Sequence, residues 1–585
     1  MILRVLQARF SDALKDLTDD ATTYLDMIRP SQDPKFGDFQ ANIAMPLGKK
    51  LGKPPREVAA EIVKNLDLSG ICGEPEIAGP GFINLRLNES FLAELLNKTL
   101  LDADRLAVPL VDDSRKKRIV IDYSAPNVAK PMHVGHIRST MIGNAIANIL
   151  TFLGHDVITD NHIGDWGTQF GMIIYGYRNF LDKEAFEANP IKELSRLYRL
   201  VRQMVDNPTP DGPDVGAMVL QETAKLHSGD PDNLALWHSF VPICMEDIQR
   251  IYDRLGIKFD YTLGESFYHP MLKPLVVELI NRGIARETEG AIGIFLYGEE
   301  VPMLIRKRDG AFLYSTTDLA TIRYRIDEFN PDEILYLTDF RQSHHFEQLF
   351  AAAKLTEKEQ PDLVHVKFGT VLGEDGKAFK TRSGDTVGLE SLLDEAERRA
   401  LNIVSSNDDS KPPEVVRLTE DERRETARRI GLGALVYADL SQNRESDYVF
   451  SFDKMLAMNG NTATYMQYAY ARVRSIFTKG NIDVTALRQS EKPILLAAPE
   501  ERALAMELLK FDEAIESVVR DYRPNQLTAY LFELANRYSS FFEQCPVLKA
   551  DDESVKESRL KLCDLTARTI QLGLRLLGIE TVERM

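Results

Sequence analysis

The chain has 585 residues and a formal net charge of −18 at pH 7, with 71 Lys and Arg against 89 Asp and Glu. This length predicts several domains, each large enough for its own hydrophobic core. The acidic balance argues against a protein that coats nucleic acid through a generally basic surface, although local basic patches can still bind a nucleic acid.

Cysteine usage and hydropathy indicate a soluble, cytoplasmic protein with no membrane partner. The four cysteines are scattered and form no C-x-x-C pair, which favours reduced thiols and predicts no structural zinc and no protein-bound metal. The amphipathic segment 1–17 carries Arg4, Arg9, Asp12 and Asp16, and it lacks the apolar core of a secretion signal. No apolar run is long enough to cross a bilayer.

Residues 1–110 are predicted to form an N-terminal α+β domain. Helical spacing occurs near 1–28, 55–66 and 89–100, around short extended pieces such as 76–87, where Gly79, Pro80 and Gly81 interrupt the pattern.

Residues 111–388 alternate between strand and helix, with a mostly helical insertion at about 180–258. Alternation split in this way predicts an α/β fold with a split, doubly wound (Rossmann-type) parallel sheet. The expected strands are 119–124, 155–160, 333–339 and 363–372, with further extended pieces at 291–298 and 311–315; the expected helices are 136–153, from 167, 317–329 and 341–355.

Beyond about residue 385 the strand signal ends. Residues 389–460 are predicted to be a helical connector, and residues 461–585 an all-α bundle. Helical spacing covers 389–404, 418–440, 461–477 and most of 498–578.

The segment 119–136, IVIDYSAPNVAKPMHVGH, is predicted to be a strand, followed by a loop and then by the start of a helix. That arrangement sets free helix N–H groups beside the strand's carboxyl end, a position that favours polyphosphate. His133 and His136 share a face of the first turn, Gly135 allows close approach of a ligand, and Lys130 lies three residues upstream. Alone, H-x-G-H is weak, because two polar surface histidines at a helix start explain it equally well.

The segment 373–387, GEDGKAFKTRSGDTV, follows a later strand and is rich in glycine. Lys377, Lys380 and Arg382 concentrate positive charge in a loop that can close on a triphosphate. An exposed, solvated hairpin is the alternative for this segment alone. The pairing of both motifs at opposite halves of one sheet favours function.

These motifs carry a resemblance to a known family. HVGH with a KMSKS-like loop resembles the class I aminoacyl-tRNA synthetases. DYSAPNVAKPMHVGHIRSTMIGNAI (122–146) and NHIGDWGTQFG (161–171) are similar to arginyl-tRNA synthetases of the bacterial type. The resemblance continues over nearly the whole chain, at 37–59, 78–85, 313–325, 379–387, 465–477 and 577–585.

The resemblance implies ATP-dependent activation of L-arginine to arginyl-adenylate, with Mg²⁺, and transfer to the 3′-terminal adenosine of tRNA(Arg). AMP and pyrophosphate are released. It also implies transfer to the 2′-OH, activation that needs bound tRNA, and a monomer. The alternatives are another class I synthetase, a nucleotidylyltransferase-type enzyme with the same H-x-G-H turn, and a non-catalytic tRNA-binding relative.

The resemblance to the family also implies which residues form the nucleotide site. His133, His136, Lys130 and Lys380 are expected to be catalytic. The loop departs from KMSKS, so either Lys380 or Arg382 fills the second-lysine place, and we hypothesise that Lys130 supplies the missing phosphate contact. The residues expected to bind ATP are His133, Gly135, His136, His345, Lys380, Arg382 and Ser383.

A guanidinium group pairs with a fixed carboxylate through two parallel N–H donors. Asp122 and Asp318 are the candidate acids for arginine, and Tyr314 is expected to wall the pocket. Taken singly, Asp318 is better explained as a helix-start residue, and Tyr314 can be a core aromatic; the shared placement at strand ends and the motif match favour the arginine site. The remaining candidates for arginine contact are Ala125, Asn127, His136 and Gln342. Such a pocket rejects lysine without an editing domain.

Two local patches are candidates for tRNA binding. In the C-terminal bundle, Tyr465, Tyr468, Arg472 and Arg474 suit stacking on splayed bases and contact with phosphates. In the N-terminal domain, the candidates are Lys49 and Lys53, with Lys50 and Arg56 near them. The alternative for the tyrosines is that they belong to the core of the helical bundle. The alternative for the lysines is that they are part of an ordinary solvated surface.

Overall fold

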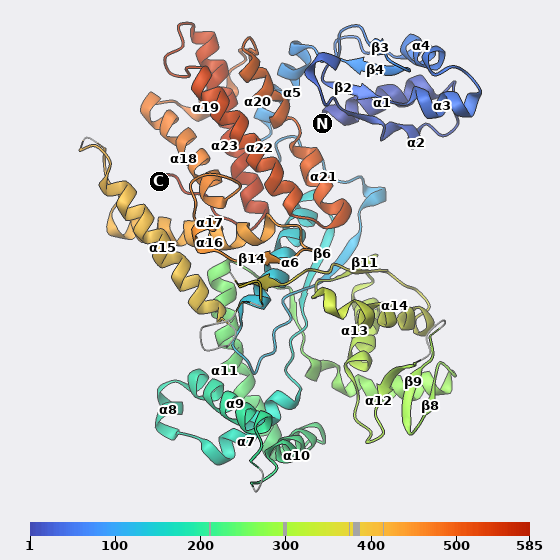
Figure 1. Ribbon diagram of the computed structural model, residues 1–585, viewed down its shortest axis with the longest axis vertical. Helices are drawn as coiled ribbons and strands as arrows, with labels where there is room; N and C mark the ends of the chain where they lie inside the picture. The colour runs from blue at the N-terminus through green and yellow to red at the C-terminus, as the bar shows by residue number, and fades with distance from the viewer. Residues whose placement is uncertain (210–211, 297–300, 374, 378, 380–386, 414) are drawn as a thin grey trace.

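The computed structural model describes residues 1–585 except 210–211, 297–300, 374, 378, 380–386 and 414, together with the side chain of residue 34. Figure 1 shows a central sheet with the N-terminal region at the upper right and a helical bundle at the upper left. Two lobes lie below the sheet, one formed by α7–α11 and one by α12–α14.

The N-terminal region is α+β, as predicted. Its four-stranded antiparallel sheet has the order β1-β2-β4-β3, and residues such as Leu6, Phe10 and Phe39 are buried in its core. The strands are β1 Ile28–Pro30, β2 Phe39–Ala41, β3 Glu76–Ala78 and β4 Phe82–Leu85; the helices are α1 Ile2–Leu14, α2 Thr22–Leu25, α3 Ala44–Leu51, α4 Pro55–Asn65 and α5 Glu89–Leu101.

The central sheet is parallel, has five strands in the order β12-β11-β5-β6-β7, and confirms the predicted doubly wound fold. Strand β5 is buried on both faces along Ile119–Ile121, as befits a central parallel strand. The chain order reverses between β5 and β11, so a crevice is expected at their carboxyl ends. The strands are β5 Arg118–Asp122, β6 Asp156–Asn161, β7 Tyr261–Thr262, β11 Glu333–Tyr336 and β12 Asp362–His365.

Helix α6, Val134–Leu153, connects β5 to β6, and a helical insertion follows β6. Four helices of the insertion begin at an Asp or Asn whose side chain accepts a backbone N–H, at Asp182, Asn189, Asp214 and Asp230. The helices are α7 Thr168–Phe180, α8 Lys183–Ala188, α9 Pro190–Asp206, α10 Val215–His227 and α11 Pro231–Leu255.

The lobe between β7 and β12 contains a helix at 265–281 and strands at 285–288 and 303–306 that the sequence pattern did not predict. The expected extended piece 311–315 is wrong at its end, because α13 begins at Tyr314. The hydroxyls of Ser315 and Thr316 donate to the carbonyls of Leu304 and Ile305, which ties the start of this helix to β10. The elements are α12 Glu265–Asn281, β8 Ala285–Thr288, β9 Ala291–Ile294, β10 Met303–Arg306, α13 Tyr314–Phe329, η3 Phe340–Gln342 and α14 Ser343–Thr356.

The predicted strand 363–372 is divided into β12 and the short strand β13, Val371–Leu372. Strand β13 pairs in parallel with β14, Tyr448–Val449, which lies beyond the point where strands were expected to end. A strand of two residues has no alternation for a sequence pattern to reveal.

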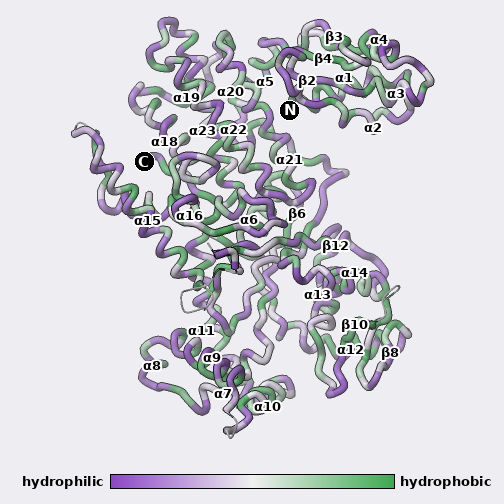
Figure 2. Tube along the Cα trace, viewed as in Figure 1, coloured by the Kyte–Doolittle hydropathy of each residue, from purple (hydrophilic) through white to green (hydrophobic). Residues whose placement is uncertain are grey.

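The rest of the chain is helical, as predicted, and the helices alternate between hydrophobic and hydrophilic positions (Figure 2). They are α15 Leu389–Asp409, α16 Glu420–Leu440, α17 Phe452–Met455, α18 Ala463–Gly480, α19 Val484–Gln489, α20 Pro499–Leu508, α21 Phe511–Asp521, α22 Asn525–Gln544 and α23 Glu553–Leu576. No helix in the described part of the chain is both long and apolar enough to span a bilayer.

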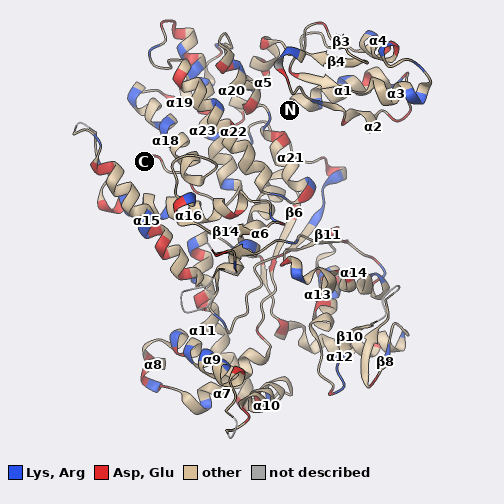
Figure 3. Ribbon diagram, viewed as in Figure 1, with Lys and Arg blue, Asp and Glu red and all other residues tan. Residues whose placement is uncertain are grey.

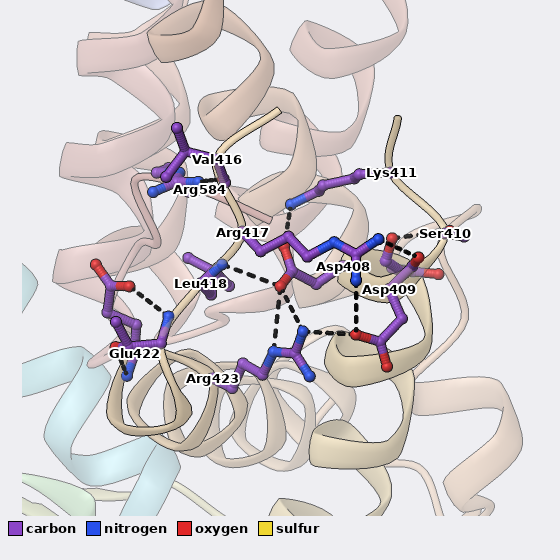
Figure 4. A network of polar contacts seen from close by, with 12 residues as sticks. Asp408, Asp409, Ser410, Lys411, Val416, Arg417, Leu418, Glu422, Arg423 and Arg584 are labelled. Carbon is purple, nitrogen blue, oxygen red and sulfur yellow. Dashed lines mark hydrogen bonds and ion pairs between the residues drawn. The ribbon is translucent and has the colours of Figure 1, made fainter. Parts of the chain in front are cut away.

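The turn between α15 and α16 is organised by Asp408 (Figure 4). Its buried carboxylate accepts hydrogen bonds from Lys411 at 2.9 Å, from the Leu418 amide at 3.0 Å and from Arg423 at 2.8 Å. Burial raises the pKa of this carboxyl, but the bonds from Lys411 and Arg423 outweigh burial and lower it to about 2. The charged carboxylate therefore fixes the angle of the α15–α16 hairpin.

Candidate active site

A strained turn follows β5 and redirects the chain toward α6. Ser124 and Ala125 both have positive φ angles, 72° and 45°, a conformation that costs about 1–3 kcal/mol for each non-glycine residue. The Ser124 amide donates to Ser139 Oγ at 2.9 Å, and the Ala125 amide donates to Asn161 Oδ1 at 3.1 Å. These bonds hold the strain at the carboxyl edge of the sheet.

The two histidines of HVGH are locked into one tautomer by the backbone at the start of α6. His133 Nδ1 accepts from the Gly135 amide at 3.1 Å, and His136 Nδ1 accepts from the His133 amide at 3.0 Å. A neutral ring whose Nδ1 accepts must carry its proton on Nε2. Both rings therefore present an Nε2–H donor, and their centroids lie 4.0 Å apart.

Both rings are also held in the neutral form. Burial, and then the neighbouring His133, lower the pKa of His136 to about 3. Burial and the charge of Lys130 lower the pKa of His133. The charge of Lys130 also contributes to lowering the pKa of His136, and Lys130 Nζ lies 5.6 Å from the centroid of the Tyr198 ring.

Gly135 is required by the packing of the turn. A Cβ atom at this position would lie 2.9 Å from His133 Cε1 and 3.0 Å from His133 Nδ1. Any side chain would therefore push the His133 ring away from the backbone that orients it.

The end of the basic segment 373–387 lies beside HVGH. The Val134 amide donates to Val387 O at 3.0 Å, and the Leu389 amide donates to Met132 O at 2.9 Å. His133 and Gly388 form an isolated antiparallel bridge. Three residues predicted to bind ATP in this segment, Lys380, Arg382 and Ser383, lie outside the described residues.

The predicted Asp318 and His345 are brought together. His345 Nε2 and Asp318 Oδ2 are 2.6 Å apart, and both side chains are partly exposed. The hydrogen bond to Asp318 raises the pKa of His345, which favours an imidazolium–carboxylate pair. Tyr314, His344 and His345 line a pocket of about 780 Å³ between β10 and the starts of α13 and α14.

Glu265 adds a carboxyl group that sequence reasoning missed. It is the first residue of α12, and burial together with Asp165 and Asp318 raises its pKa to about 7. Asp318 is thus one of the charges that act on the Glu265 carboxyl group. No local pattern marks it, because it follows a long insertion at the start of an ordinary helix.

Asp122 lies at the end of β5, as predicted, but one of its oxygens is bound by the protein itself. Arg325 of α13 donates to Asp122 Oδ2 at 2.7 Å and to Asp160 Oδ2 at 2.8 Å. Asp122 and Asp318 both raise the pKa of Tyr336 at the end of β11, although burial is the larger cause. Asp122 is also the register partner of Tyr336 at the carboxyl end of β11. Asp160 was also missed, although its place at a strand end was a usable signal.

The other residues predicted for arginine binding have mixed surroundings. The Ala125 amide is already engaged with Asn161. Asn127 Oδ1 accepts from the Ala129 amide at 3.2 Å, and Asn127 forms a bridge with Gly164 of the 161–171 motif. Gln342 is exposed at the end of η3, directly before α14.

The C-terminal patch is only partly accessible. Tyr468 is 39% exposed, the Arg472 guanidinium lies over the Phe542 ring at 4.0 Å, and Tyr465 bonds through its hydroxyl to Ser539 at 3.2 Å. These three side chains share the α22 side of α18. Arg474 points elsewhere and pairs with Glu583 at 2.7 Å.

In the N-terminal patch, Lys49 is exposed in the last turn of α3, and Lys53 pairs with Glu61 at 2.7 Å. Figure 3 shows Lys and Arg intermingled with Asp and Glu over the molecule. Within the described residues there is no group of three or more His, Cys, Asp or Glu side chains arranged to hold a metal ion.

Three family models match the chain in succession. The arginyl tRNA synthetase N terminal domain matches residues 4–87, the class I (R) tRNA synthetase catalytic domain matches 97–452, and the DALR anticodon binding domain matches 466–585. Together with the parallel sheet and the HVGH turn, these matches define a class I aminoacyl-tRNA synthetase. The domain boundaries expected at residues 110, 388 and 460 stay predictions.

Individual relatives narrow the class. An arginine–tRNA ligase of Rhodopirellula baltica is 48% identical, with 99% of each chain covered. One of Vibrio campbellii is 46% identical, with 95% of each covered. The arginyl-tRNA synthetase structure of Plasmodium falciparum has a TM-score of 0.82 and 28% identity, covering 100% of this chain and 99% of that chain. The chain belongs to the arginyl-tRNA synthetase family, as its sequence motifs predicted.

Proposed function

We propose that the crevice at the carboxyl ends of β5 and β11 activates L-arginine with ATP and transfers it to tRNA(Arg). As an arginine–tRNA ligase, the chain forms arginyl-adenylate and pyrophosphate, and then arginyl-tRNA and AMP. The observation that carries the assignment of the site is the pair of oriented Nε2–H donors at His133 and His136, beside the end of the basic segment 373–387.

In the activation step an oxygen of the arginine carboxylate attacks the α-phosphorus of ATP. The bond to the bridging oxygen of the β-phosphate breaks, and its electron pair leaves with pyrophosphate. Negative charge grows on the α-phosphoryl oxygens, where fixed N–H donors stabilise the transition state more than the ground state. We assign this role to His133 and His136, with Lys130, Lys380 and Arg382 near the leaving group; Mg²⁺ enters with ATP as part of the substrate.

Arginine recognition is assigned to the acids around α13. Asp318 is the main partner of the guanidinium, and Glu265 is a second acceptor on the same space. Tyr314 at the start of α13 walls the pocket, and Gln342 and Asn127 are assigned to the ends of the substrate. Asp122 has one oxygen bound to Arg325, so its contact with the substrate is left to its other oxygen.

In the transfer step the 2′-OH of the terminal adenosine attacks the carbonyl carbon of arginyl-adenylate. The hydroxyl proton is lost, and AMP departs with the electron pair of the anhydride bond. We assign the tRNA contacts to Tyr468, Arg472 and Tyr465 on α18, and to Lys49 and Lys53 in the N-terminal domain. The enzyme is proposed to act as a cytoplasmic monomer that activates arginine only when tRNA is bound.

The test of the site is a comparison of arginine with lysine and citrulline in wild-type and Asp318→Asn enzymes. Aminoacylation of total tRNA by the wild type is expected with arginine alone. Asp318→Asn should raise the KM for arginine by about 10²-fold, because the bound guanidinium keeps its charge but loses the carboxylate that accepts its N–H donors, while the KM for ATP stays within a factor of two to three. An unchanged KM for arginine removes Asp318 from the pocket.

The tRNA requirement has its own test, the exchange of pyrophosphate into ATP with and without tRNA. Exchange is expected only with tRNA. Robust exchange without tRNA contradicts that part of the proposal, and charging with an amino acid other than arginine contradicts the assigned specificity.

A further inference from the structure

The segment 441–450 connects α16 to α17. It pairs with residues 369–372, which lead into the basic segment 373–387. The Gly369 amide donates to Arg444 O at 2.8 Å, and the Tyr448 amide donates to Thr370 O at 3.2 Å. Asp447 Oδ1 accepts from the Thr370 amide at 2.6 Å, and β14 continues the pairing with β13. The position of segment 441–450 therefore sets the position of the base of the basic segment.

Arg444 is largely buried and joins this strand to the C-terminal helical region. Its guanidinium donates to the carbonyl of Lys367, to Tyr522 O at 3.0 Å and to Asp521 O at 3.1 Å. Residue 367 lies on the approach to the basic segment, and residues 521 and 522 end α21, inside the region that matches the anticodon binding domain. The planar guanidinium of Arg444 thus binds backbone carbonyls of two segments that are more than 150 residues apart in the sequence.

The same turn of the C-terminal region makes two further contacts with the catalytic part. The Tyr522 hydroxyl donates to Glu333 at the start of β11, and Arg523 donates to Glu445 Oε1 at 3.0 Å. Tyr522 has a φ of 52°, the left-handed conformation that ends α21 and turns its carbonyl toward Arg444. The turn is therefore docked on segment 441–450 by several polar contacts rather than by one.

Segment 441–450 and the adjoining end of α16 also bind α6, the helix that begins in the HVGH motif. Arg138 of α6 and Asp439 at the end of α16 form an ion pair of 2.9 Å, and both side chains are at most 1% exposed. Arg138 also donates to Ser446 O at 2.9 Å. A shift of the segment would therefore act on both α6 and residues 369–372, which carry the two parts of the proposed nucleotide site.

We propose that Arg444 is a positioning residue through which tRNA bound to the C-terminal domain sets the nucleotide site. Arg444 touches no substrate; it transmits a displacement of the α21–α22 turn to residues 367–372, which end in β13, and so to the basic segment. The proposal rests on the proposed function, because it concerns the tRNA dependence of the same reaction. Coupling between two sites requires an element whose arrangement both ligands bias, and segment 441–450 contacts both sides.

The test measures how strongly tRNA changes the affinity for ATP. The dissociation constant of a non-hydrolysable ATP analogue is determined with and without saturating tRNA(Arg), and the ratio of the two constants is the coupling factor. We expect a wild-type factor of about 5-fold or more and a factor within about 2-fold of unity in Arg444→Gln. Arg444→Lys, which keeps the charge but cannot bridge three carbonyls, should lie between them. The affinity for the analogue without tRNA should not change.

The matched control is Arg520→Gln, an exposed arginine in the last turn of the same α21 helix, which should keep the wild-type factor. If Arg444→Gln does not fold, as judged by thermal unfolding, Arg444→Lys and Arg523→Gln test the same contact. A wild-type factor of one, or an unchanged factor in the folded Arg444 variants, overturns the proposal. Charging of tRNA with arginine by the wild type is scored separately, so that failure of the coupling and failure of the proposed function are distinguished.

Discussion

Arg325 and Asp160 form an ion pair in which neither side chain is exposed to solvent, with Nη2 and Oδ2 2.8 Å apart. Arg325 belongs to α13, which also carries Tyr314 and Asp318, whereas Asp160 lies on β6. Arg325 bonds Asp122 of β5 as well. The helix that presents the proposed arginine contacts is therefore anchored to two strand ends of the central sheet.

Removal of this anchor is expected to destabilise the protein strongly. Asp160→Asn leaves the Arg325 charge buried with one carboxylate fewer, and such losses typically cost about 3–5 kcal/mol. Urea denaturation measures the change. Arg323→Gln, in the same helix but with partly exposed partners, should cost about 1 kcal/mol or less. Equal unfolding free energies for the two variants would rule out the anchor.

His345 should make arginine binding depend on pH. Asp318 raises the pKa of His345 above its usual value, so the ion pair is complete below about pH 6.5 and is lost as the pH rises through the raised pKa. The imidazolium competes with the guanidinium of arginine for Asp318. The KM for arginine is therefore expected to fall several-fold between pH 6 and pH 8.

The variant His345→Gln should lower the KM for arginine at pH 6 and flatten this part of the pH profile. His344→Gln is the matched control, because this neighbour lines the same pocket without a bond to Asp318. A His345→Gln enzyme with the wild-type profile would show that the pair does not limit arginine binding.

Glu265 should release a proton when arginine binds. Its pKa is about 7, so about half of the molecules carry the proton at neutral pH. A bound guanidinium stabilises the carboxylate and lowers this pKa. Calorimetric titration of arginine at pH 7 in two buffers of different ionisation enthalpy measures the release, in the presence of tRNA if arginine requires it.

We expect Glu265→Gln to lower the number of protons released per bound arginine by roughly 0.5. The same variant should weaken arginine binding more at pH 8 than at pH 6. Glu287→Gln, an exposed acid on β8, should match the wild type. If the proton release is unchanged in Glu265→Gln, the carboxyl group that titrates lies elsewhere.

The sequence is informative where function depends on local pattern, and less so where it depends on long-range pairing. Strand β5 and the HVGH helix start are visible as an apolar run, a proline-broken loop and two histidines three residues apart. The tautomers of His133 and His136 also follow from local backbone bonds, but only coordinates reveal them. Arg325 lies 203 residues from Asp122, and no periodicity signals that they meet.

The start of α13 shows the same limit. Residues 311–315 contain four aromatic or apolar side chains and were expected to be extended, yet a helix begins at Tyr314 because Ser315 and Thr316 bond to β10. Glu265 is an acid with ordinary neighbours in the sequence. Its raised pKa comes first from burial and then from Asp165 and Asp318, which are 100 and 53 positions away.

The orientation of His136 leads to the sharpest test of the nucleotide site. His136→Asn places an amide oxygen near the position of Nδ1, so that the His133 amide keeps an acceptor, but it removes the donor at Nε2. Loss of one transition-state donor typically lowers kcat by about 10²–10³-fold, and we expect a decrease of this size in tRNA-dependent pyrophosphate exchange with little change in the KM for ATP. His238→Asn, in the insertion, is the control.

The pH profile separates this mechanism from one that uses an imidazolium. Because the pKa of His136 is about 3, the ring is neutral between pH 6 and pH 8, and kcat should not fall as the pH rises through this range. If kcat decreases through about pH 6.5, the usual pKa of histidine, and His136→Asn abolishes that decrease, a charged His136 carries out the reaction. A flat profile with a large loss of kcat in His136→Asn assigns catalysis to the neutral Nε2–H donor.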